Sequence, residues 1–108
     1  MGEAIKHRDF LSLLSRAKNT KRRNKLIDIA DPNELKAVAE CFLNILNGNI
    51  KVSANQLNKM KRKKSTMRKL VGKRNSHKKR KEYIKQTGGF LPTILPLALT
   101  LLSSFIKK

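Results

Sequence analysis

The chain has 108 residues, enough for one small domain, and its 26 lysines and arginines against 7 acidic residues give a formal net charge of +19. A protein this basic repels itself, so we expect a polyanion as its partner (DNA, RNA or an anionic membrane surface) and no small-molecule substrate. The single cysteine excludes an intrachain disulfide and the N-terminus lacks a secretory pattern, so we expect an intracellular protein and not a secreted one.

Apolar residues at helical spacing indicate two short helices in the first third of the chain. One covers residues 10–17 and the other covers residues 26–30, with a break at 19–20. No window of useful length alternates with the period of a β-strand, apart from a short stretch at 50–52.

The strongest helix pattern lies between residues 31 and 48. Asp31 and Glu34 form a capping box, Pro32 suits the first helical position, and Asn47 and Gly48 supply a left-handed stop. The apolar residues of one face recur at steps of three and four: Leu35, Val38, Ala39, Phe42, Leu43 and Leu46. We therefore predict that this is the core helix.

Three further segments follow the core helix. Ser53 and Gln56 predict a capped helix, residues 67–71 form a short amphipathic turn that Gly72 ends, and Asn75–Ser76 can cap a last segment that carries Tyr83 and Ile84. The sequence therefore predicts an all-α fold, a small bundle of short helices with a basic C-terminal half and an apolar C-terminal helical tail.

The basic half contains no acidic residue between positions 41 and 81. Like charges at i, i+4 spacing destabilise a free helix by roughly 0.2 to 0.5 kcal/mol per pair, and phosphates would reverse that effect. The alternative is that the run only solubilises the protein or forms a flexible tail. We predict a nucleic-acid site, with DNA favoured over RNA, made of Arg22, Arg23, Lys25, Lys59, Lys61, Arg62, Lys63, Lys64, Arg68, Lys69, Lys73, Arg74, Lys78, Lys79, Arg80 and Lys81.

The composition of this run favours contacts with the phosphate backbone over base recognition. Most of its residues are lysines, which lack the rigid fork with which arginine recognises guanine. Aromatic residues are only 5% of the chain, which leaves little for base stacking. Residues 59–64 and 78–81 also match the pattern of nuclear import signals.

We expect no enzymatic activity, no cofactor and no metal. His7 and His77 are flanked by cations, and Cys41 lies on or beside the apolar face of the core helix, where a packed thiol is the ordinary interpretation. Cysteine and histidine spacings typical of metal sites are absent from the sequence.

The C-terminal tail is strongly apolar but contains two prolines. Pro92 and Pro96 predict a continuous helix only from about Pro96 onward, so it would extend for about 15 Å, half of a bilayer core. We expect a basic body at 1–89 and a separable tail at 90–108 that can make peripheral membrane contact. The alternative is that the tail folds back on the core helix, because small domains need every apolar residue.

The junction between the two segments carries a distinctive order of residues. A basic stretch is followed by Gly88 and Gly89, the apolar Phe90, then Leu91-Pro92 and a second proline four residues later. This order, over the last fifth of the chain, resembles the adenovirus core protein X (mu precursor) family and related small proteins of Maverick/Polinton elements and adintoviruses. The resemblance implies a basic part that condenses DNA in the virion and a viral cysteine protease that cuts after Gly88-Gly89, so that Phe90 becomes the first residue of the released tail.

The leading hypothesis is therefore a structural, sequence-tolerant DNA-binding and DNA-condensing protein of the viral core type. One alternative is a cationic membrane-active or membrane-anchored protein. Another is a small helical regulator of the helix-turn-helix kind, in which a few side chains near one helix start would discriminate bases.

Overall fold

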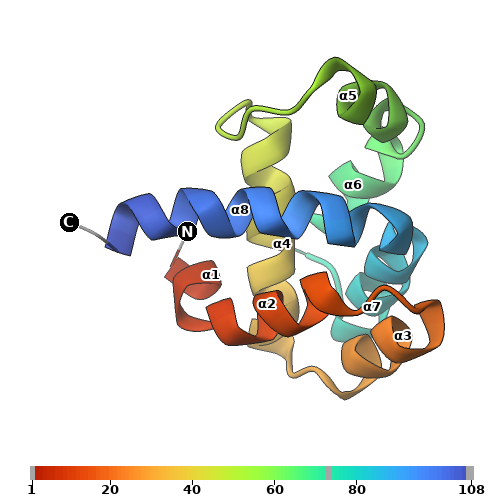
Figure 1. The fold of residues 1–108 in the computed structure, drawn as a ribbon. Coiled ribbons are helices and arrows are strands. Elements are labelled where there is room, and N and C mark those ends of the chain that lie inside the picture. The colour runs from red at the N-terminus through yellow and green to blue at the C-terminus, as the bar shows by residue number, and fades with distance from the viewer. Residues whose placement is uncertain (1, 73, 107–108) are drawn as a thin grey trace.

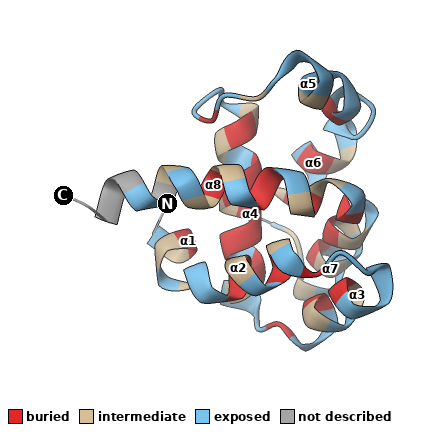
Figure 2. Ribbon diagram, viewed as in Figure 1, coloured by how far each residue is buried: buried red, intermediate tan, exposed pale blue. Residues whose placement is uncertain are grey.

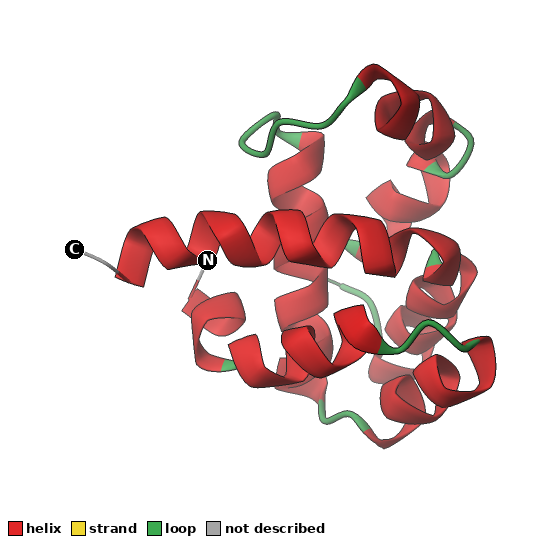
Figure 3. Cartoon of the chain, in the orientation of Figure 1, coloured by secondary structure: helices red, strands yellow, loops and turns green. Residues whose placement is uncertain are grey.

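The structure is a computed structural model that describes residues 2–72 and 74–106, without the side chains of residues 102 and 104–106. Within these ranges the chain forms eight α-helices, one 3-10 helix and no strand (Figures 1 and 3), which confirms the predicted all-α class. The helices are α1 (Gly2–Lys6), α2 (Arg8–Arg16), α3 (Thr20–Ile29), α4 (Pro32–Leu46), α5 (Ala54–Lys61), α6 (Lys64–Leu70), α7 (His77–Gln86), the 3-10 helix η1 (Gly88–Phe90) and α8 (Leu91–Ile106).

Both ends of α4 form as the sequence predicts, with side-chain capping at the start and a glycine at the end. The Asp31 carboxylate accepts a hydrogen bond from the Glu34 N–H at 2.8 Å, and the Glu34 carboxylate accepts one from the Asp31 N–H at 2.9 Å. Gly48 then has φ of +76°, a left-handed conformation that glycine adopts without strain, so the chain turns away after Leu46.

Side-chain caps also begin three other helices. The Asn19 side chain accepts from the backbone N–H of Lys21 at the start of α3. Ser53 forms a capping box with Gln56 at the start of α5, and Ser76 accepts from the Lys79 N–H at the start of α7. Each cap satisfies backbone donors that would otherwise lack partners, which explains why the short basic helices begin where they do.

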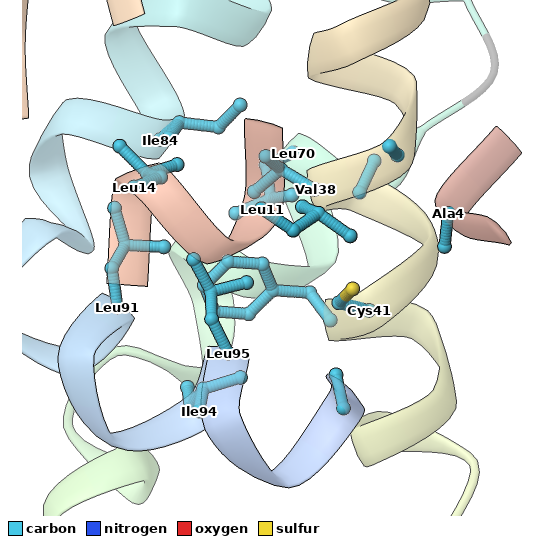
Figure 4. Packing of buried hydrophobic residues seen from close by; sticks show 14 of the residues in the cluster. Ala4, Leu11, Leu14, Val38, Cys41, Leu70, Ile84, Leu91, Ile94 and Leu95 are labelled. Carbon is cyan, nitrogen blue, oxygen red and sulfur yellow. The ribbon is translucent and has the colours of Figure 1, made fainter. Parts of the chain in front are cut away.

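The core surrounds α4, which α8 crosses and against which α1, α2, α6 and α7 also pack (Figure 1). Buried residues face inward along all of these helices (Figure 2). Figure 4 shows how side chains of α2, α4, α6, α7 and α8 meet: Leu11, Leu14, Val38, Cys41, Leu70, Ile84, Leu91, Ile94 and Leu95. Phe42, a member of the predicted apolar face, is fully buried in the same cluster.

Part of the tail lies in this core, as expected if the tail folds back on the core helix. The division into a body at 1–89 and a separable tail at 90–108 stays a prediction. Leu91, Ile94, Leu95 and Ala98 are fully buried in the common cluster. The helix also begins at Leu91 and not near Pro96. Pro92 lies in the first turn of α8, where the missing backbone N–H costs no hydrogen bond, so it does not delay the start of the helix. Pro96 lies inside the helix.

The packing of α8 bears on the membrane alternative. Over residues 91–98, the apolar face of α8 contacts α2 and α4. The same face would have to enter a bilayer if the tail inserted into a membrane. Among the helices of the described ranges, none combines the length and apolar character needed to cross a membrane.

Candidate nucleic-acid interface

Most of the predicted binding residues lie on the surface. Lys81 is half-buried, Arg23 and Arg80 are buried, and Lys73 lies outside the described residues. The exposed ones are Arg22, Lys25, Lys59, Lys61, Arg62, Lys63, Lys64, Arg68, Lys69, Arg74, Lys78 and Lys79.

The densest group occupies the corner between α5 and α6. The first helix ends at Lys61 and the second begins at Lys64, so Arg62 and Lys63 form the connecting turn. Met60 and Met67 are buried beneath this corner, so each helix has an inner apolar side and an outer basic side. The helices therefore hold the cations outward on a structured scaffold and not on a flexible tail.

Two smaller groups continue from this corner. Arg74, Lys78 and Lys79 lie at or just before the start of α7, and Arg22 and Lys25 lie on α3. Helix α7 packs against both α6 and α3, and Figure 1 shows α5, α6, α7 and α3 following one another along one side of the molecule. The molecule measures 33 × 30 × 29 Å, close to the roughly 34 Å of one turn of duplex DNA.

Arg23, one of the predicted binding residues, lies inside the fold. Its side chain is 5% exposed, and its guanidinium donates to the Ala17 carbonyl and to the Thr20 hydroxyl, each at 3.2 Å. The group packs against Gly88, so that it joins α3 to the start of η1. Arg23 therefore makes its contacts within the fold, and its role in binding nucleic acid stays a prediction.

Arg80, a second predicted binding residue, is also buried. It is 6% exposed and donates to the Gly72 carbonyl at 3.0 Å, which ties α7 to the end of α6. Burial lowers the pKa of its guanidinium from the ordinary value, because removal from water disfavours the charged form. A basic residue in the middle of a lysine run gave no indication of this inward orientation.

The Lys81 side chain makes a hydrogen bond within the fold. Its ammonium donates to the Asp28 carbonyl oxygen at 2.6 Å, and Lys85 pairs with the Asp28 carboxylate at 2.5 Å. Both contacts fasten α7 to the C-terminal end of α3, so Lys81 contributes less to an outward-facing surface than its position in the run suggests.

The segment that forms the α5–α6 corner contains no acidic residue. The chain has no acid between 41 and 81, and six of its seven acidic residues lie between positions 3 and 40. In the part of the chain that the structure describes, no salt bridge involves a cation of α5 or α6. These cations are therefore available for an external anion.

Sequence reasoning missed one cation of the α3 group. Lys21 is exposed and, with Asn19, Arg22 and Lys25, lines a shallow open depression at the start of α3. The signal was present in the sequence, because positions 21, 22 and 25 share one side of a helix that Asn19 caps.

The glycine junction has a compact conformation. Gly88 and Phe90 belong to η1, the Phe90 N–H donates to the Thr87 carbonyl at 2.9 Å, and both Thr87 and Gly88 are buried. A protease needs an accessible, extended segment, so cleavage at Gly88-Gly89 requires local unfolding first. Cleavage stays a prediction.

Cys41 and the acidic residues offer little for catalysis. Burial, reinforced by the neighbouring Glu40 charge, raises the pKa of the Cys41 thiol to about 12, so the thiol stays protonated at neutral pH. Within residues 2–72 and 74–106, no group of three or more His, Cys, Asp or Glu side chains is placed to hold a metal ion.

Comparison of the chain with protein-family models, with curated proteins and with solved structures finds no match. The functional argument therefore rests on the geometry and charge of the chain itself.

Proposed function

We propose that this protein is a non-enzymatic, sequence-tolerant nucleic-acid-binding protein, and that its target is duplex DNA. The observation that carries the proposal is the α5–α6 corner, where Lys59, Lys61, Arg62, Lys63 and Lys64 are all exposed and unopposed by acids. Lysines at such a corner neutralise phosphates and release condensed counterions, which supplies affinity without base recognition.

We also propose that the protein condenses DNA and serves as a structural protein of a viral core. Figure 1 shows α3 and α5 at opposite ends of the side along which the basic groups follow one another, so Arg22 and Lys25 could neutralise a second segment of DNA. The order Gly-Gly, Leu-Pro and Pro, which resembles the adenovirus core protein X family, supports a role in packaging viral-type DNA and a location in the nucleus or in the virion.

The decisive experiment is a salt titration of binding to duplex DNA. If six to ten phosphates are contacted, the affinity should fall by roughly 10³ to 10⁵ between about 50 and 200 mM salt, and DNAs of unrelated sequence should bind alike. A nearly flat dependence on salt would contradict the proposal. A strong preference for one sequence would instead favour the helix-turn-helix alternative.

A matched pair of charge variants localises the interface. The corner variant replaces Lys61, Arg62, Lys63 and Lys64 with glutamine, and the control variant makes the same replacement at Lys6, Arg8, Lys18 and Lys36. Both variants lose the same formal charge. If all four corner residues contact phosphates, the slope of log K against log salt should become shallower by roughly 3 to 4 in the corner variant, and it should change far less in the control.

A further inference from the structure

An apolar groove opens between the C-terminal end of α4 and helices α5 and α6. Its volume is about 220 Å³, and Ile45, Met60 and Met67 form its buried part. Leu57, which also lines it, is 46% exposed. The groove is large enough to receive a leucine or phenylalanine side chain from another molecule.

Helix α5 presents an apolar face that the chain itself covers only in part. Leu57 and Met60 are one helical step apart, yet Met60 is 6% exposed and Leu57 is 46% exposed. Helix α5 packs only sparsely against the other helices, which leaves Leu57 about half exposed within the described chain. An apolar surface rimmed by polar residues is typical of an interaction site.

The rim of the groove is cationic. Lys61 and Lys64 line it, and Arg62 and Lys63 lie in the turn between them. With no acid between 41 and 81, an apolar ligand that also carries negative charge is favoured here over a neutral or cationic one.

We propose that this groove binds an acidic amphipathic helix of a partner protein, with an apolar side chain against Leu57 and carboxylates toward Lys61 and Lys64. Methionines such as Met60 and Met67 suit this mode because their flexible, polarisable side chains adapt to a docked helix. A nucleobase fits less well, since none of the described lining residues is aromatic and the buried part offers no hydrogen-bond partner for its polar edge.

The groove would bind the acidic helix whether or not the protein binds DNA, but the two ligands would affect each other's binding. Lys61 and Lys64 belong both to the groove and to the candidate nucleic-acid interface. The acidic helix and DNA would therefore compete for the same cations.

The test uses two synthetic helical peptides of about 16 residues with equal negative charge. One carries leucines at i, i+4 spacing among glutamates, and the other carries alanines in place of the leucines. Fluorescence anisotropy with the full chain at about 150 mM salt should show at least about tenfold tighter binding of the leucine peptide, because charge alone cannot distinguish the two.

Leu57→Ala should remove most of this difference, whereas Leu13→Ala, which changes a leucine on α2 that is 52% exposed, should leave it intact. Unchanged affinity of Leu57→Ala for duplex DNA would separate the groove from the phosphate surface and support the inference. Equal binding of the two peptides, or no effect of Leu57→Ala, would overturn it. The inference would also be overturned if Leu57→Ala lost affinity for the peptide and for duplex DNA together. It would likewise be overturned if anionic phospholipid vesicles displaced the peptide and this displacement depended on Leu57.

Discussion

Replacement of Gly88 by alanine tests whether the glycine junction is a packing requirement. A Cβ atom at Gly88 would lie 3.1 Å from the Arg23 Nε, closer than an ordinary van der Waals contact, whereas a Cβ atom at Gly89 would meet nothing within 4 Å. Neither glycine has a positive φ, so the backbone accepts alanine at both positions. The two neighbouring substitutions therefore differ only in what the added methyl group meets.

The magnitude follows from two opposing effects. Forcing a methyl group into a packed site costs about 1 to 3 kcal/mol, and Arg23 cannot move away easily because it is buried and holds hydrogen bonds to Ala17 and Thr20. Replacing glycine by alanine also restricts the unfolded chain, which stabilises the protein by about 0.4 to 1 kcal/mol. We expect Gly88→Ala to lower the stability by about 0.5 to 2 kcal/mol and Gly89→Ala to raise it slightly.

Thermal unfolding followed by circular dichroism measures this difference. At about 4 °C per kcal/mol for a chain of this size, Gly88→Ala should melt about 2 to 8 °C below the wild type, and Gly89→Ala should melt at or above it. Combining Gly88→Ala with Arg23→Leu should abolish the extra cost, because the group that the methyl meets is gone. Equal melting temperatures for the two alanine variants would refute the packing argument and favour a plain hinge.

Three further outcomes follow from the core. A chain that ends at Gly89 loses three fully buried large side chains of α8, at about 1.5 to 3 kcal/mol each, so it should lose cooperative melting by calorimetry. Phe42→Ala should lower the free energy of unfolding by about 3 to 5 kcal/mol in urea titrations, and unchanged melting would show that α4 is not the core. The pKa of Cys41 is raised to about 12, so its protonated form stabilises the fold below pH 9, and the free energy of unfolding should fall by about 1.4 kcal/mol per pH unit above that. Cys41→Ala should show a shallower decline between about pH 9 and 11. Identical slopes for the variant and the wild type would contradict the burial of Cys41.

The helix ends were predictable because capping is local. Asp31, Ser53 and Ser76 each lie next to the backbone donors they satisfy, and Gly48 needs only its own backbone freedom to stop α4. A pattern of a few neighbouring residues contains all of this information. The apolar face of α4 was predictable for a similar reason, since its spacing alone places Phe42 and Leu35 on one side.

The inward orientation of two arginines and the docking of the tail were not predictable in this way. Ala17 and Thr20 are local partners of Arg23, but Gly88, against which its guanidinium packs, comes close only in the folded chain. Charge patterning treats every arginine of a basic run alike, although a guanidinium can satisfy backbone carbonyls and leave the surface. In the same way, the two prolines of the tail indicated a helix break, and the tertiary contacts of α8 overrode that local preference.

The tail and the basic corner are linked energetically although they do not form one site. A net charge of +19 makes the compact state repel itself, and six of the seven acids that could offset this precede position 41 in the sequence. The hydrophobic contacts of α8 therefore help to hold together a fold whose own charges oppose it. A bound polyanion acts in the same direction, since a ligand at about 100 times its Kd adds about 2.7 kcal/mol to the stability of the folded state. If the protein binds DNA as proposed, it should therefore be more stable in the bound state than when it is free.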